Sequence, residues 1–264
     1  MKSQADFFAV LCYGSGMTPS AWERFARSRE RYRREVASLG RKLPQLQSLQ
    51  QRLVDSRTPS YPVETPVVYN GALDDVDRNS DIRMILVGDN PGRREQAAEN
   101  RRYLVGPSGK IAERFFRENP ALGIDFRKNV IILNKTPIHT PRTVELRELC
   151  RLGGPDLEAA LEQSQRLMAR LLLEFHEAFC EKGTAIPVWI IGYSEMKKGG
   201  VFEAYTSELK AIYEGSGLGE AVCMYRHFSM NQFTIDLKQQ TAGRETVIQT
   251  LGRIGVAYRE RFLW

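Results

Sequence analysis

Four short and almost uninterrupted apolar segments constrain the fold of this chain most strongly. They are rich in Val, Ile and aromatic residues, and they read IRMILVG at 82–88, NVIILN at 129–134, PVWIIG at 187–192 and AVCMYRH at 221–227. Strands of this composition are typically buried on both faces. Segments with helical periodicity follow them, at 108–119, 155–182, 201–214 and 243–262. This alternation predicts a parallel sheet between two layers of helices, joined by right-handed crossovers.

A further helical pattern precedes the first strand. Apolar residues share one face over 19–55, and Pro44 is expected to kink or split this helix. Prolines at 59, 62 and 66 then end the pattern. We therefore expect an α/β three-layer sandwich with a central, mainly parallel four-stranded sheet flanked by helices. An N-terminal helical extension at 1–57 is expected to pack on a core at 58–264.

Composition limits the class of protein. With 264 residues, of which 42% are hydrophobic, the chain can bury a large core. No segment is long enough to cross a bilayer, and FFAVLCYG near the start lacks a signal-peptide cleavage pattern, so we expect a cytoplasmic protein that does not bind membranes. The four cysteines are widely separated and form no C-x-x-C pair. This spacing argues against a thiolate metal site and a disulfide scaffold, and we expect neither metal nor cofactor.

The charge distribution favours a polyanionic partner. The net charge is +6, and residues 21–42 carry eight basic side chains but only three acidic ones. Two interpretations of this basic segment stay open. It is either a solvated helix face with i,i+4 ion pairs or a surface that follows phosphates.

Polar residues follow the predicted strands at the points where the strands end. These exits read Asp89-Asn90, Asn134-Lys135, Tyr193-Ser194 and His227-Phe228-Ser229. In parallel α/β sheets, ligands bind beyond the carboxyl ends of the strands. The sequence therefore predicts that a carboxylate, amides and an imidazole converge on one crevice.

Four sequence motifs, three of them at these strand ends, resemble those of a known family. GDNPG at 88–92, YLVGPSG at 103–109, VIILNKTP at 130–137 and HFSMNQF at 227–233 resemble, in this order, the motifs of the uracil-DNA glycosylase superfamily. The resemblance covers about residues 82–235. The first motif is a hybrid, because Asn90 matches the G-x-N-P-G branches and Asp89 matches the acid of the iron-sulfur branch. The cysteine pattern of that branch is absent, and Phe228 stands where proline usually follows the histidine.

The resemblance implies a monofunctional DNA glycosylase. Such an enzyme flips a deaminated base, here expected to be uracil, out of DNA and hydrolyses its N-glycosidic bond. His227 is expected to donate a hydrogen bond to O2 of the leaving base, where negative charge accumulates. Asp89 is expected to stabilise the sugar cation or activate water, and Asn90 to orient that water. Asn134 is expected to recognise O4 and N3 of uracil through its amide.

Other positions receive supporting roles by the same resemblance. Tyr103 or Leu104 is expected to stack on the base. Residues expected to bind phosphate or to fill the gap left by the flipped nucleotide are Pro91, Gly92, Ser108, Gly109, Ser229, Met230 and Asn231. His139 is an alternative nucleophile, since one branch resembles this chain in having a reactive histidine in that neighbourhood. Lys135 leaves Schiff-base chemistry open, although hydrolysis is favoured.

Two other functions stay open. The chain could be a catalytically weak nucleic-acid-binding member of the same fold, or a nucleoside or nucleotide hydrolase. His176 and Cys180 lie one helical turn apart without a second pair of ligands, so we interpret them as structural. The expected partner is DNA that contains a damaged base, bound by a monomer.

Overall fold

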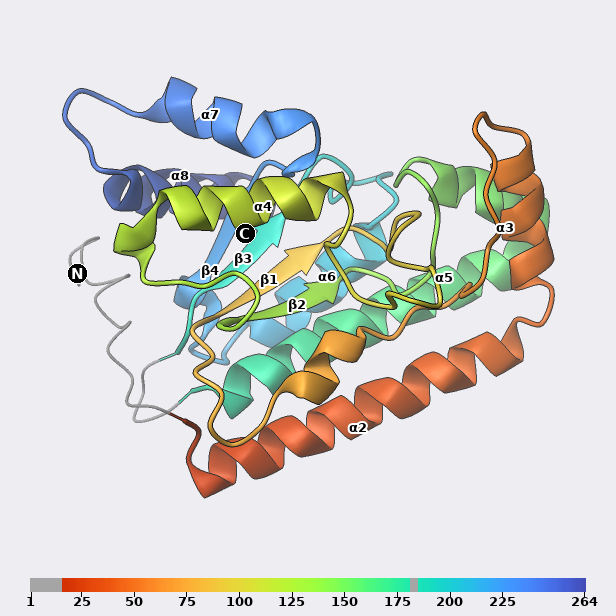
Figure 1. The fold of residues 1–264 in the computed structure, drawn as a ribbon, viewed down its shortest axis with the longest axis horizontal. Coiled ribbons are helices and arrows are strands. Elements are labelled where there is room, and N and C mark those ends of the chain that lie inside the picture. Colours follow the sequence, from red (N-terminus) through yellow and green to blue (C-terminus); the bar gives the residue numbers. More distant parts are fainter. Residues whose placement is uncertain (1–15, 181–184) are drawn as a thin grey trace.

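The fold is built on a four-stranded parallel sheet with the order β2-β1-β3-β4 (Figure 1). The computed structural model describes residues 16–180 and 185–264. The strands are β1 (Met84–Gly88), β2 (Val130–Asn134), β3 (Val188–Ile191) and β4 (Val222–Tyr225), and all of their residues are buried. The four predicted strands are therefore confirmed, and so is their burial on both faces.

Side chains alternate between two hydrophobic clusters, one on each face of the sheet. In β1, Ile85 and Val87 join one cluster, whereas Met84 and Leu86 join the other. Helices α2 (Pro19–Lys42), α3 (Leu46–Asp55), α5 (Glu145–Ala178) and α6 (Glu203–Tyr213) contribute to the first cluster. Helices α4 (Pro107–Glu118), α7 (Gln232–Gln240) and α8 (Val247–Phe262) contribute to the second. The predicted three-layer sandwich is confirmed (Figure 1).

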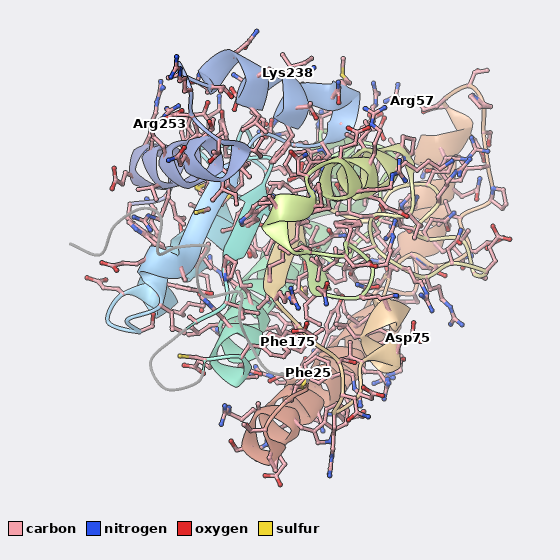
Figure 2. The ribbon with its side chains drawn as sticks, turned by 60° about the vertical axis from the view of Figure 1, so that its left-hand side comes forward. Phe25, Arg57, Asp75, Phe175, Lys238 and Arg253 are labelled. Carbon is pink, nitrogen blue, oxygen red and sulfur yellow. The ribbon has the colours of Figure 1, made fainter. Side chains whose placement is uncertain are left out.

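The N-terminal helices pack directly on this sandwich. The helical pattern divides between Lys42 and Leu46, as expected from Pro44. Phe25 of α2 packs against Phe175 of α5, with ring centroids 5.6 Å apart, and Figure 2 shows these two side chains meeting between the helices. Both rings belong to the cluster that also covers the sheet. The helices α2 and α3 thus share a continuous core with the α/β part.

Several arginines of the basic segment bond to neighbouring elements of the chain. Arg29 of α2 donates to the carbonyls of Leu73 and Val76 at 3.1 Å each. Arg31 pairs with Glu174 of α5, and Arg33 pairs with an acid of the short helix η1 (Gly71–Asp75). These bonds fasten α2 to neighbouring elements. They support the interpretation as a helix face with ion pairs rather than as a surface that follows phosphates.

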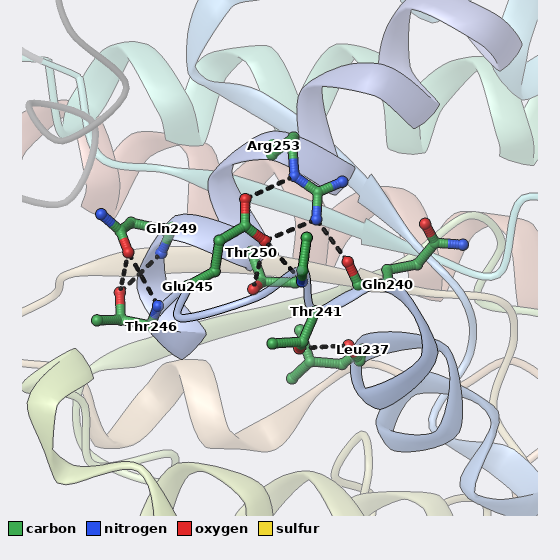
Figure 3. A network of polar contacts seen from close by, with 9 residues as sticks. Leu237, Gln240, Thr241, Glu245, Thr246, Gln249, Thr250 and Arg253 are labelled. Atoms are coloured by element: carbon green, nitrogen blue, oxygen red, sulfur yellow. Dashed lines mark hydrogen bonds and ion pairs between the residues drawn. The ribbon is translucent and has the colours of Figure 1, made fainter.

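Two helical features differ from the sequence prediction. Helix α5 begins at Glu145 rather than near 155, and it bends at Gly154, whose φ of +72° is in the left-handed region before Pro155. Helix α7 was not predicted. Its connection to α8 is held by Glu245, which accepts from Arg253, and by a capping box between Thr246 and Gln249 (Figure 3). None of the described helices is long and apolar enough to cross a membrane.

Candidate active site

The carboxyl ends of the strands open into one cleft of about 1460 Å³. Asp89 and Asn90 follow β1, Asn134 ends β2, and His227 follows β4 by two residues. All four line this cleft. The structure therefore brings together the carboxylate, the two amides and the imidazole that the strand exits supplied. Residues far apart in the chain meet here because parallel strands end at one edge of the sheet.

Asn134 lines the cleft and has a buried hydrogen-bond donor without a partner among the described residues. Its side chain is 2% exposed, and its amide nitrogen Nδ2 has no hydrogen-bond partner in the part of the chain that the structure describes. A buried donor without a partner costs about 1–3 kcal/mol. A ligand carbonyl could satisfy this donor. Gly88 leaves the space that the amide needs, because a Cβ there would lie 2.6 Å from Oδ1 of Asn134.

We expect Gly88→Ala to displace the Asn134 amide and to lower ligand affinity about tenfold, since one hydrogen bond of about 1.4 kcal/mol would be lost or distorted. The measurement is binding of a labelled uracil-containing oligonucleotide, together with the thermal unfolding midpoint. Gly40→Ala is the matched control, because a Cβ at this α2 position meets nothing within 4 Å. Equal affinity in both variants would contradict a role for the Asn134 amide.

Asp89 forms an ion pair with a buried lysine, a contact that the sequence did not predict. Lys135 is fully buried, and its Nζ lies 2.5 Å from Oδ1 of Asp89. It also donates to the carbonyl of Ile191 at 2.7 Å. The Thr143 hydroxyl, which has a single proton, lies 3.1 Å from both Oδ2 of Asp89 and Oδ1 of Asn90. These contacts fix the plane of the carboxylate, which remains 17% exposed toward the cleft.

Lys135 has no access to a substrate in this arrangement. It does not line the cleft, and burial lowers its pKa while the Asp89 carboxylate opposes that shift. A Schiff base requires an amine that reaches the sugar carbon. The Lys135 ammonium is therefore not placed to form a Schiff base with a ligand in the cleft. Gly192 makes room for this pair, since its φ is +79° and a Cβ there would lie 2.8 Å from Oδ1 of Asp89.

His227 is oriented by its own loop. The backbone N–H of Ser229 donates to Nδ1 of His227 at 3.0 Å, and the Ser229 hydroxyl lies 2.8 Å from the same atom. Because Nδ1 accepts, the neutral imidazole carries its proton on Nε2. Burial lowers the pKa of His227, the Asp89 carboxylate raises it, and the Lys135 ammonium lowers it further. The neutral ring is therefore favoured, with Nε2–H as its donor.

Asn90 and Glu95 build the wall of the cleft. The Asn90 amide donates to the Thr140 hydroxyl at 2.9 Å, and its Oδ1 lies 3.1 Å from the Thr143 hydroxyl. Asn90 thus joins two loops rather than pointing unbound groups at a substrate. Glu95, which sequence reasoning missed, accepts from the backbone of Gly92 and of Leu104, and burial raises its pKa to about 7. It connects the turn after β1 to the loop before α4.

The remaining predicted residues divide into two groups. Those that line the cleft are Gly92, Leu104, Ser108, Ser229 and Met230, whereas Pro91, Tyr103, Gly109 and Asn231 do not. Met230 is 83% exposed, and both it and Asn231 have left-handed backbone, with φ of 52° and 60°.

Tyr103 lies in the core instead of the cleft. Its side chain is 1% exposed, its hydroxyl lies 2.6 Å from that of Tyr32, and it donates to the carbonyl of Val68. Leu104 therefore replaces it as the candidate for base contact. Gly109 also packs internally, because a Cβ there would collide with the carbonyl of Leu104.

The other histidines are engaged in the interior. Nδ1 of His139 lies 2.7 Å from the Pro91 carbonyl and Nε2 lies 3.1 Å from the Tyr61 hydroxyl. Burial lowers the pKa of His139 to about 4, and the ring does not line the cleft, so it is not placed as a nucleophile. His176 is likewise buried, bonded to Tyr213 and Ile186. Among residues 16–180 and 185–264, no three His, Cys, Asp or Glu side chains group as metal ligands.

Comparison with known proteins adds no assignment. No protein-family model matches the chain, and no curated protein matches it. The case for a function therefore depends on the four motifs and on the geometry of the cleft.

Proposed function

We propose that this protein is a DNA glycosylase that extrudes a deaminated base, uracil in the first instance, and hydrolyses its bond to deoxyribose. The observation that carries the proposal is that Asn134, whose buried Nδ2 has no partner among the described residues, lines one cleft with Asp89 and His227. A flipped-base pocket needs an amide that reads the Watson-Crick edge, and uracil offers a carbonyl O4 as acceptor. We also expect a cytoplasmic monomer.

The proposed chemistry assigns one role to His227 and another to Asp89. As the C1′–N1 bond breaks, its electron pair moves into the base, and charge builds up on O2. The Nε2–H of His227 is the donor for this oxygen. The Asp89 carboxylate stabilises the cationic sugar, and water adds to C1′ on that side. The proton of this water passes to Asp89 and then to solvent, while the base leaves as an anion.

Two features of the rim support an extruded nucleotide. Met230 is exposed at the edge of the cleft, where an apolar side chain can occupy the gap left in the base stack. Unstacking a base costs a few kcal/mol, so a substitute for the missing stack lowers this barrier. Leu104 also lines this cleft, and the 4% of its surface that remains exposed is the apolar contact that we propose for the base.

The test is base release from oligonucleotides that contain a single uracil, hypoxanthine or xanthine, followed by alkaline cleavage of the abasic product. We expect cleavage of the uracil strand, dependent on time and enzyme. Deoxyuridine as free nucleoside is the parallel substrate. Activity on the nucleoside without activity on the strand would support a nucleoside hydrolase instead. Salt-sensitive DNA binding without release of any base would support a catalytically weak binding protein.

A further inference from the structure

Two exposed arginines border the cleft. Arg142 lies in the segment that follows β2, and Arg226 directly follows β4. These strands are the two outer strands of the sheet. Both arginines line the cleft, and their side chains are 65% and 49% exposed. Thr143, the neighbour of Arg142, contacts Asp89, and Arg226 directly precedes His227, so both arginines lie beside the candidate site residues.

Each of these arginines forms an ion pair with a buried carboxylate. Nε of Arg142 lies 2.8 Å from Oε1 of Glu145, whose side chain is only 2% exposed. Nε of Arg226 lies 3.3 Å from Oδ1 of Asp236, whose side chain is 6% exposed. Asp236 is fixed in turn by the Tyr258 hydroxyl at 3.0 Å.

Such an arrangement differs from an ordinary surface ion pair. Burying a carboxylate is unfavourable unless it is paired, and an exposed pair of two mobile side chains contributes little. Here the acid is immobile, so the guanidinium is fixed at the rim of the cleft. A guanidinium has five N–H donors in a planar fork, and its remaining donors suit a phosphate.

We propose that Arg142 and Arg226 bind phosphates of the DNA strand that carries the extruded nucleotide. This inference rests on the proposed function and specifies its substrate as a nucleotide within a chain. A DNA strand carries a phosphate at every nucleotide, so one strand can supply a phosphate to each arginine.

The experiment measures binding of a fluorescent single-stranded oligonucleotide with a central 2′-fluoro-2′-deoxyuridine, whose fluorine disfavours the sugar cation and so slows hydrolysis. Arg142→Gln and Arg226→Gln should each weaken binding about tenfold. Each should also reduce the slope of log Kd against log salt concentration by about 0.7, the value for one phosphate contact on a single strand. Arg142→Lys and Arg226→Lys keep a cation beside the buried acid and guard against unfolding. They should retain the slope but lose part of the affinity.

Arg253→Gln is the matched control. Arg253 also pairs with an acid, Glu245 (Figure 3), but it lies on α8 and does not line the cleft. Its replacement should leave the affinity and the salt slope unchanged. Wild-type slopes in both Arg142→Gln and Arg226→Gln, or an equal loss in Arg253→Gln, would overturn the proposal. This assay measures binding and does not depend on base release. Altered salt slopes without release of any base would therefore contradict the proposed glycosylase activity but not the binding of phosphates by the two arginines.

Discussion

Replacement of His227 by alanine should lower the rate of uracil release about 100-fold, which corresponds to the loss of one preorganised donor to a developing oxyanion. Binding of the same oligonucleotide should change little, because charge on O2 develops only as the glycosidic bond breaks. The measurement is single-turnover release of base from a labelled strand. His227→Gln is the companion variant, since an amide N–H restores a donor and should recover part of the rate.

The pH profile distinguishes catalysis by His227 from a purely structural role. Burial lowers the pKa of this imidazole below its ordinary value near 6.5. The neutral form therefore predominates above that lowered pKa, and it accepts from Ser229 while donating through Nε2. We expect the rate to fall as the pH drops through the lowered pKa, because protonated Nδ1 cannot accept. A wild-type rate in His227→Ala, with an unchanged acid limb, would remove the histidine from the mechanism.

The strands and the polar residues that follow them could be predicted, because parallel strands buried on both faces have a recognisable sequence pattern. Each is an apolar segment that ends where polar residues begin, and topology places all of the ends together. Asp89, Asn134 and His227 were found in this way. The direction in which a side chain points after the end of a strand could not be predicted. Lys135 follows Asn134 directly but points inward beneath Asp89, and sequence periodicity cannot tell which of two successive residues turns into the core.

Tyr103 and α7 show two further limits of sequence reasoning. Tyr103 sits one position before Leu104, whose left-handed backbone, with φ of 52°, turns the chain so that only the leucine reaches the cleft. Nothing in the residue types signals this turn. Helix α7 is nine residues long and follows two residues in the left-handed conformation. So short a helix carries little periodicity, and its stability comes from packing of Phe233 and Leu237 on the sheet.

Asp89→Ala should destabilise the fold as well as reduce activity. It removes the carboxylate from a fully buried lysine, and a buried charge that loses its partner costs about 3–5 kcal/mol. We expect a clear fall in the urea midpoint of unfolding. Asp75→Ala is the matched control, because its ion pair with Arg102 is exposed on both sides and should contribute less than about 1 kcal/mol (Figure 2).

A second substitution tests the cause of that loss. Lys135→Met in the Asp89→Ala background removes the unpaired ammonium and keeps most of the side-chain volume, so it should restore much of the lost stability. Activity should stay low in the double variant, because the carboxylate beside the sugar is still missing. Recovery of stability without recovery of the rate of base release would separate the role of Asp89 in folding from its role in catalysis. If the double variant is instead less stable than Asp89→Ala, the lysine supports the fold through its bonds to the Gly88 and Ile191 carbonyls rather than through the carboxylate.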